Sequence, residues 1–165
     1  MELDFALPDP RLAPYISTYY RVFVDYPLIE DVERADVGYL RFMFSGTGFY
    51  DYGGGQRDPD RPVMLLGPAT RTASYSVRGP LESFGCVLLP AFWGGIVEAA
   101  AHSHANRALD AVPTLGADAL ILFEALKRTR DVARMGRLMD AFLLPRIRAI
   151  PPDHLEVIDR IGNWL

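Results

Sequence analysis

The fold of this chain is decided by the segment VGYLRFMFSGTGFYDY, residues 37–52. Aromatic and aliphatic side chains that favour strands fill residues 37–44, and residues 49–52 have the same character. Between them, the SGTG sequence at residues 45–48 is typical of a tight turn. The segment therefore predicts two antiparallel strands that pair as a hairpin.

Further strands are expected on both sides of this hairpin. Upstream, residues 16–24 are rich in aromatic and β-branched side chains, and a polar stretch, residues 27–36, connects them to the hairpin. Downstream, a loop rich in glycine and proline precedes three more strands, at residues 63–67, 71–77 and 83–89, the last two separated by a turn at 78–80. Short strands joined by such turns indicate a sandwich or a small barrel rather than a parallel sheet.

Helical turns are indicated by capping residues and by apolar spacing. Asp9 before Pro10 predicts a short helical turn over residues 9–15. After Pro90 a short helix is expected at residues 92–101, a second follows Asp118 as its cap, and a third covers residues 132–147. We expect the last two helices to form an antiparallel pair.

The third helix carries an apolar stripe with i, i+3, i+4, i+7 and i+8 spacing. Its members are Met135, Leu138, Met139, Phe142 and Leu143. The stripe can pack on the sheet of its own subunit or on the same helix of a second subunit, where a two-fold contact would be self-complementary.

A last helix is expected after Pro151 and Pro152, with Asp153 as its cap. Its apolar positions are Val157, Ile158, Ile161, Trp164 and Leu165. No residues follow on which that stripe could pack, and a free helix of this length is marginal in water. We therefore expect residues 151–165 to be a linker and the first element of a second, truncated domain.

Composition favours one folded, cytoplasmic domain. Half of the 165 residues are hydrophobic, and the formal net charge is only −4. No apolar run reaches the ~20 residues that span a bilayer, and the acidic MELD start does not resemble a signal peptide. Cys86 is the single cysteine, which excludes an internal disulfide and fits a reducing compartment. No membrane partner is expected.

Charge argues against nucleic acid as a direct partner of most of the chain. Residues 1–126 hold nine arginines and no lysine against sixteen acids. Residues 127–148 hold seven basic side chains against two acidic ones, which we interpret as a solvated helix face.

Several stretches carry a resemblance to a known family: PRL at 10–12 leading into YISTYY at 15–20, FMFSG at 42–46, LGP at 66–68, SFGCVLLP at 83–90, NRALD at 106–110, FLLPR at 142–146 and LEVIDRIGNWL at 155–165. Together they resemble the N-terminal half of AraC-type transcriptional regulators. In that family a cupin-like sensor precedes a linker and a DNA-binding domain with two helix-turn-helix motifs.

The resemblance implies an α+β fold, with a cupin-like antiparallel β-barrel (a double-stranded β-helix) followed by a C-terminal helical hairpin. Residues 1–150 would be the sensor and dimerisation domain, and residues 151–165 the linker and the start of the DNA-binding domain. The implied function is effector sensing by a homodimer, in which the stripe of the third helix lies at the dimer interface. DNA would be bound only through the missing C-terminal domain.

A ligand is expected inside the barrel, on the face to which strand alternation assigns Tyr39, Arg41 and Met43. Tyr75, Phe84 and Cys86 are expected to complete the site. An inward Arg41 needs an anionic partner, so a carboxylate-bearing ligand is a hypothesis. The alternative is that Arg41 points to solvent and side chains fill the interior. Cys86 also suits simple core packing.

Catalysis and metal binding are not expected. Metal-dependent cupin enzymes need histidines on the barrel strands, and residues 37–90 contain none. The pair His102 and His104 has ligand spacing but lies outside the strands, where a polar helix end is the simpler interpretation. No cofactor is predicted. Two alternatives stay open: a metal-free cupin-fold enzyme, such as an isomerase, and a stand-alone small-molecule binding protein.

Overall fold

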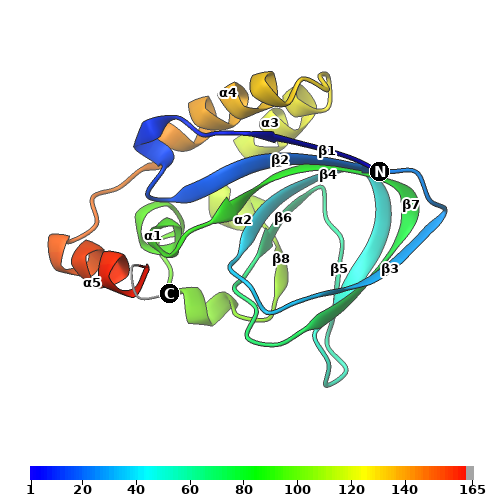
Figure 1. The fold of residues 1–165 in the computed structure, drawn as a ribbon, viewed down its shortest axis with the longest axis horizontal. Coiled ribbons are helices and arrows are strands. Elements are labelled where there is room, and N and C mark those ends of the chain that lie inside the picture. Colours follow the sequence, from blue (N-terminus) through cyan, green and yellow to red (C-terminus); the bar gives the residue numbers. More distant parts are fainter. Residues whose placement is uncertain (163–165) are drawn as a thin grey trace.

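The computed structural model describes residues 1–162, and within them an antiparallel sheet of eight strands is covered on one face by helices (Figure 1). The fold class is therefore α+β, as predicted. The strands are β1 (Glu2–Ala6), β2 (Ile16–Val24), β3 (Leu28–Glu33), β4 (Tyr39–Asp51), β5 (Arg57–Pro59), β6 (Val63–Leu66), β7 (Ala73–Leu88) and β8 (Ala108–Asp110).

Two long strands, β4 and β7, form the centre of the sheet. They pair antiparallel over their whole length, from Tyr39 opposite Val87 to Asp51 opposite Ser74. β2 pairs with the second half of β7, and β3 pairs with its first half. The prediction that residues 27–36 are only a polar connection is wrong, because β3 lies within them.

The turn predicted at residues 45–48 is also wrong, because β4 continues through the SGTG sequence. Two register shifts, on either side of Ser45, let the strand bend without ending. At Gly48 the two strands approach so closely that a Cβ would clash with the Ser76 carbonyl oxygen. β7 likewise runs through the break predicted at residues 78–80. Pairing between two long strands therefore overrides the local turn signals.

The sheet bends but does not close. Its strands follow the order β1-β2-β7-β4-β6-β8, with β3 on β7 and β5 on β4 outside this path. Since β1 and β8 lie at the two ends of the path, the structure shows an open sheet, and the predicted closed barrel is not confirmed.

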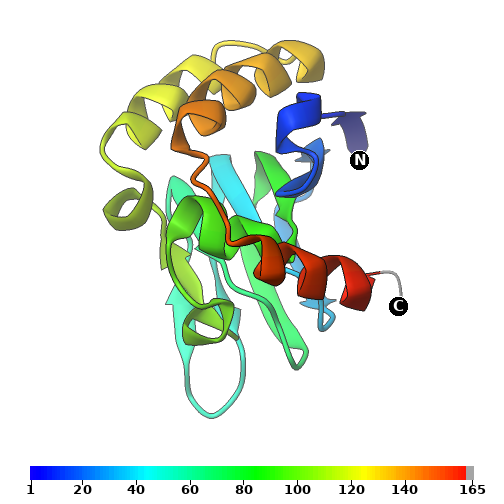
Figure 2. The ribbon, with the colours of Figure 1, turned by 90° about the vertical axis from the view of Figure 1, so that its left-hand side faces the viewer.

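The helical segments are η1 (Pro10–Leu12), α1 (Pro90–Phe92), the π-helical η2 (Trp93–Val97), η3 (Ala101–His104), α2 (Val112–Leu115), α3 (Asp118–Leu126), α4 (Val132–Leu143), η4 (Leu144–Arg146) and α5 (Pro152–Gly162). Asp9 caps η1, as predicted, and Asp131 caps α4. Asp118, which the sequence predicted as a cap, lies instead in the first turn of α3. The helix expected at residues 92–101 is broken instead, because Glu98 adopts a left-handed backbone conformation. Helices α3 and α4 form a hairpin on one face of the sheet (Figures 1 and 2).

The main hydrophobic core lies between this hairpin and the sheet. We call the side of the sheet under α3 and α4 the helix-covered face and the other side the cavity face. On the helix-covered face the side chains of Leu40, Phe42, Phe84 and Cys86 are completely buried. A second, smaller core cluster, which includes Met43 and Tyr50, lies apart from it.

The apolar stripe of α4 belongs to the main core. Met135, Met139 and Leu143 are completely buried within the chain, Phe142 is 8 % exposed, and Leu138 is half-buried against the same cluster. The assignment of these five side chains to a dimer interface is therefore corrected. They pack within their own subunit, which is the alternative that the sequence left open.

The position of α4 on the sheet is fixed by β2. At Gly136 the helix comes so near that a Cβ would lie 3.1 Å from Cδ2 of Tyr19. The Tyr19 hydroxyl donates a hydrogen bond of 2.8 Å to Oδ1 of Asp140 on α4, and the Asp9 backbone N–H donates to the same oxygen at 3.0 Å. A small residue and a shared carboxylate thus hold the helix close to the strand.

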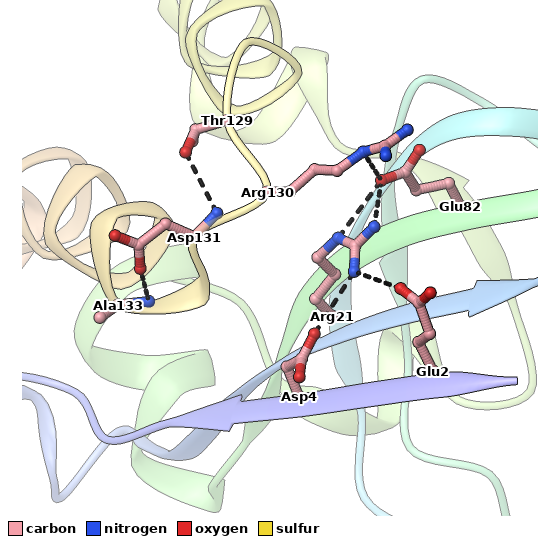
Figure 3. A network of polar contacts seen from close by, with 8 residues as sticks. All are labelled: Glu2, Asp4, Arg21, Glu82, Thr129, Arg130, Asp131 and Ala133. Atoms are coloured by element: carbon pink, nitrogen blue, oxygen red, sulfur yellow. Dashed lines mark hydrogen bonds and ion pairs between the residues drawn. The ribbon is translucent and has the colours of Figure 1, made fainter.

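A network of ion pairs around the buried Arg21 connects the edge strand β1 to the sheet (Figure 3). Arg21 on β2 is only 3 % exposed, and two of its nitrogens donate to Oε1 of Glu82 at 3.2 and 2.7 Å. Its Nη1 lies 3.3 Å from carboxylate oxygens of both Glu2 and Asp4 on β1. Arg130, in the turn between α3 and α4, reaches Glu82 at 3.8 Å. The network therefore connects β1, β2, β7 and the helical hairpin.

Helix α5 is separated from α4 by an extended segment and lies away from the hairpin (Figure 2). Arg148, in that segment, donates its backbone N–H to Gly95 at 2.8 Å, and its guanidinium pairs with Glu98 at 2.6 Å. A helix is confirmed here up to Gly162, but it begins at Pro152, so Asp153 lies in its first turn and is not its cap. Trp164 and Leu165 lie outside the described residues. Between residues 1 and 162, no helix is long and apolar enough to cross a membrane.

Candidate ligand-binding site

A cavity of about 280 Å³ lies on the cavity face, where the bend of the sheet brings β2, β3, β4 and β7 around a common space. Three tyrosines line it, Tyr20, Tyr50 and Tyr75. Its charged groups are Asp31, Glu33 and Arg41, and the remaining wall is Ser83 with the apolar side chains of Val22, Val32, Met43, Val77 and Leu81. A mostly apolar wall with a few polar groups is typical of a small-molecule site.

Arg41 is the central polar group of this site. Its Nε donates to the Tyr20 hydroxyl at 3.1 Å, its Nη1 donates to the Tyr50 hydroxyl, and its Nη2 lies 3.5 Å from Oε1 of Glu33. The guanidinium also lies 5.5 to 6.0 Å from the ring centres of Tyr20, Tyr39 and Tyr50. Such packing against aromatic faces favours a cation.

This environment answers the question of where Arg41 points. Its side chain is 17 % exposed and lines the cavity, so the alternative of a solvent-facing arginine is wrong. The anionic partner that a buried guanidinium needs is Glu33, itself 21 % exposed. The argument that a ligand carboxylate must neutralise Arg41 therefore loses its basis.

The tyrosines around Arg41 stay protonated near neutral pH. Burial raises the pKa of Tyr20 and of Tyr50 above the ordinary value, and the Arg41 charge offsets only part of this effect. Burial, together with the charges of Asp31 and Glu33, also raises the pKa of Tyr75. The three hydroxyls are thus neutral groups that can donate or accept hydrogen bonds.

A further carboxylate lies behind this group. Both carboxylate oxygens of Asp60 are buried without a hydrogen-bond partner among the described residues. Burial raises the pKa of Asp60, and the nearby Arg41 charge offsets only part of this effect. Asp60 does not line the cavity, and its ionised form is destabilised by burial next to the site.

The structure brings together only part of the predicted ligand site. Arg41, Met43 and Tyr75 line the cavity. Tyr39 lies next to it, with its ring edge-on to Tyr20 at 6.2 Å and its hydroxyl donating to Asp36 at 2.6 Å.

Phe84 and Cys86 lie on the opposite side of the sheet and are corrected as site residues. Phe84 pairs with Phe42, and Cys86 pairs with Leu40. Directly paired residues point to the same face of a sheet, so both side chains join the helix-covered core rather than the Arg41 side. Burial raises the pKa of the Cys86 thiol, as expected for a cysteine that serves as core packing.

Sequence reasoning missed several residues of the cavity. Alternation along residues 16–24 places Tyr20 and Val22 on one face and could have indicated both. Asp31 and Glu33 were hidden in the stretch interpreted as a polar connection. Tyr50 was assigned to a return strand, because the SGTG sequence concealed that it shares a strand with Arg41.

The histidine pair does not form a metal site. His102 is exposed, and the ring of His104 packs 5.3 Å from that of Trp93, with Nδ1 2.9 Å from the Ser103 hydroxyl. Among the side chains that the structure describes, no three His, Cys, Asp or Glu residues are grouped so that they could hold a metal ion.

Comparison with known proteins places the chain in no family: no protein-family model, no curated protein and no solved structure matches it.

Proposed function

We propose that this chain is the small-molecule-sensing domain of a transcriptional regulator of the AraC type, with a cupin-like fold. The observation that carries the proposal is the cavity of about 280 Å³ on the cavity face, with Arg41, Glu33 and three tyrosines in its wall. Its volume, near the lower end for ligand sites, suits a compound of roughly one ring. The proposal is for a cytoplasmic binding module rather than an enzyme.

The regulatory part of the proposal is supported by the arrangement around the cavity. The strands that line it carry the α3–α4 hairpin on their other face, and the chain then leads through an extended segment to α5. A ligand regulates only by binding two arrangements of such parts with different affinity. In the proposed protein, α5 is the first helix of the domain that contacts DNA, and the sensor acts as a homodimer.

The sensing proposal is tested with a thermal-shift screen of small polar and aromatic compounds. Compounds that bind the cavity raise the melting temperature of the wild-type chain by mass action. They do not do so in Val22→Phe, which fills space from a half-buried position in the wall. A screen in which no compound stabilises the wild type, or in which every stabilising compound also stabilises Val22→Phe, contradicts ligand sensing at this site.

The regulator proposal has its own test. The chain of residues 1–165 is expected to bind promoter DNA no better than random DNA in fluorescence anisotropy at physiological salt. Its net charge is −4, and the proposal places the recognition helices outside these residues. Sequence-specific binding by this chain would contradict the division into sensor and reader. A coding sequence that continues with two helix-turn-helix patterns would support it.

A further inference from the structure

The charges on the cavity wall are unequal. Arg41 faces two carboxylates, Asp31 and Glu33, in the same lining. Glu33 forms an ion pair with the guanidinium of Arg41. Oδ1 of Asp31 accepts a hydrogen bond of 2.7 Å from the backbone N–H of Val32. Among the described residues no basic side chain lies within ion-pair distance of Asp31. Asp31 is exposed, so beside the Arg41–Glu33 pair the wall carries one solvent-accessible carboxylate that a ligand can reach.

Three of the five N–H groups of Arg41 already have partners within the protein. Tyr20, Tyr50 and Glu33 together take its Nε, Nη1 and Nη2. A ligand carboxylate that used the remaining N–H groups would lie near Glu33, which already pairs with the guanidinium, and in the same cavity as Asp31. Like charges at such short range cost free energy. An anionic ligand is therefore disfavoured by the very residues that hold Arg41 in place.

The surroundings of Asp31 suit a cation that carries an apolar group. Tyr75 lies directly opposite Asp31 in the β3–β7 register, and its half-buried ring forms part of the same wall. Val77 and Leu81 continue the wall on β7. An ammonium group can pair with a carboxylate and also lie against the face of a tyrosine ring. An attached ring would cover the apolar side chains.

We propose that the cavity binds a small organic cation, an ammonium group attached to a single ring. The ammonium lies at Asp31 and Glu33, and the ring packs against Tyr75 and the apolar wall. This inference rests on the proposed sensing function and names its ligand class. It replaces the carboxylate-bearing ligand that the sequence suggested.

Three probes with the same ring and different charge test this assignment: benzylammonium, benzyl alcohol and benzoate. Their binding to the chain is measured by thermal shift and by ligand-observed NMR titration. Benzylammonium is expected to bind most tightly and benzoate most weakly. Asp31→Asn and Glu33→Gln are each expected to weaken benzylammonium binding roughly tenfold, the loss of one charge-assisted contact.

Glu30→Gln is the matched control. It removes the same charge from the same strand and is exposed like Asp31, but it does not line the cavity and alternates to the other face, opposite Ser76. It is expected to leave benzylammonium affinity unchanged. Because Glu33→Gln also removes the partner of Arg41, Asp31→Asn decides the matter should Glu33→Gln fail to fold.

The outcomes separate the two proposals. Benzoate or benzyl alcohol binding as tightly as benzylammonium, with Val22→Phe abolishing it, overturns the cation assignment and leaves the sensing site standing. Benzylammonium binding that Asp31→Asn does not weaken, or that Glu30→Gln weakens equally, also overturns the assignment. Failure of all three probes and of the wider screen overturns both the assignment and the sensing site.

Discussion

Truncation of Leu143 to alanine tests whether α4 belongs to the core of a single chain. Leu143 is completely buried, in the cluster that also holds Met139 and Phe84. If the packing seen here is the packing in solution, the substitution leaves a cavity between the hairpin and the sheet. If the stripe of α4 instead joined two subunits, the same substitution would act on an association equilibrium.

The magnitude follows from the atoms removed. Leucine to alanine deletes three carbon atoms, and at about 0.8 kcal/mol for each buried group the lost transfer free energy is roughly 2.4 kcal/mol. The cavity that remains adds to this, so the free energy of unfolding is expected to fall by about 2–5 kcal/mol. For a chain of this size, a loss near 3 kcal/mol lowers the melting temperature by roughly 6–12 °C.

The assay is urea unfolding followed by circular dichroism, at low and at high protein concentration. Leu7→Ala is the control, because it deletes the same atoms from a side chain that is 82 % exposed. The control is expected to change stability by less than about 0.5 kcal/mol. A loss in Leu143→Ala close to that of the control would refute the core assignment. So would a wild-type unfolding midpoint that rises with protein concentration and loses this dependence in the variant.

Three other perturbations follow from single groups. Arg21→Ala is expected to destabilise the fold by about 3 kcal/mol, which is the low end for the loss of one partner of a buried ion pair, because Glu82 keeps some solvent contact. The control Arg130→Ala should change stability little, because Arg130 is exposed. Equal urea midpoints for the two variants would contradict this prediction. Because burial raises the pKa of Asp60 in the folded state, ionisation costs stability as pH rises above the ordinary carboxyl range. Asp60→Asn should therefore be more stable than the wild type at neutral pH, with a gain that disappears in acid; a variant that is less stable at neutral pH would exclude this explanation. Cys86, buried and with a raised pKa, should react with a thiol reagent only as fast as the chain unfolds, and rapid labelling of the native protein would place it elsewhere.

The sequence predicted what depends on local spacing. Strand alternation identified the side of β4 that carries Arg41 and Met43, and helical spacing identified the buried stripe of α4. Asp9 was recognisable as a cap because its carboxylate needs only the N–H group of a residue close by, Arg11.

What the sequence did not predict depends on partners far along the chain. Alternation groups Phe84 with Cys86 but does not say which side of the sheet they share, because that follows from the pairing of β7 with β4. The SGTG sequence has the composition of a turn, and only the continuous partner strand shows that it is a pair of bulges. Glu33 reaches Arg41 because it lies on strand β3, which the sequence did not indicate.

Strand β4 has one more consequence for how a sensor of this shape would signal. Arg41 lines the cavity, whereas its two neighbours in the chain, Leu40 and Phe42, belong to the core on the helix-covered face, under the hairpin. Because Arg41 is bonded to Leu40 and Phe42 in the same strand, a ligand that shifts the backbone at Arg41 would also shift these two core residues. The cavity and the core under the helices are thus separated along β4 by only one peptide unit.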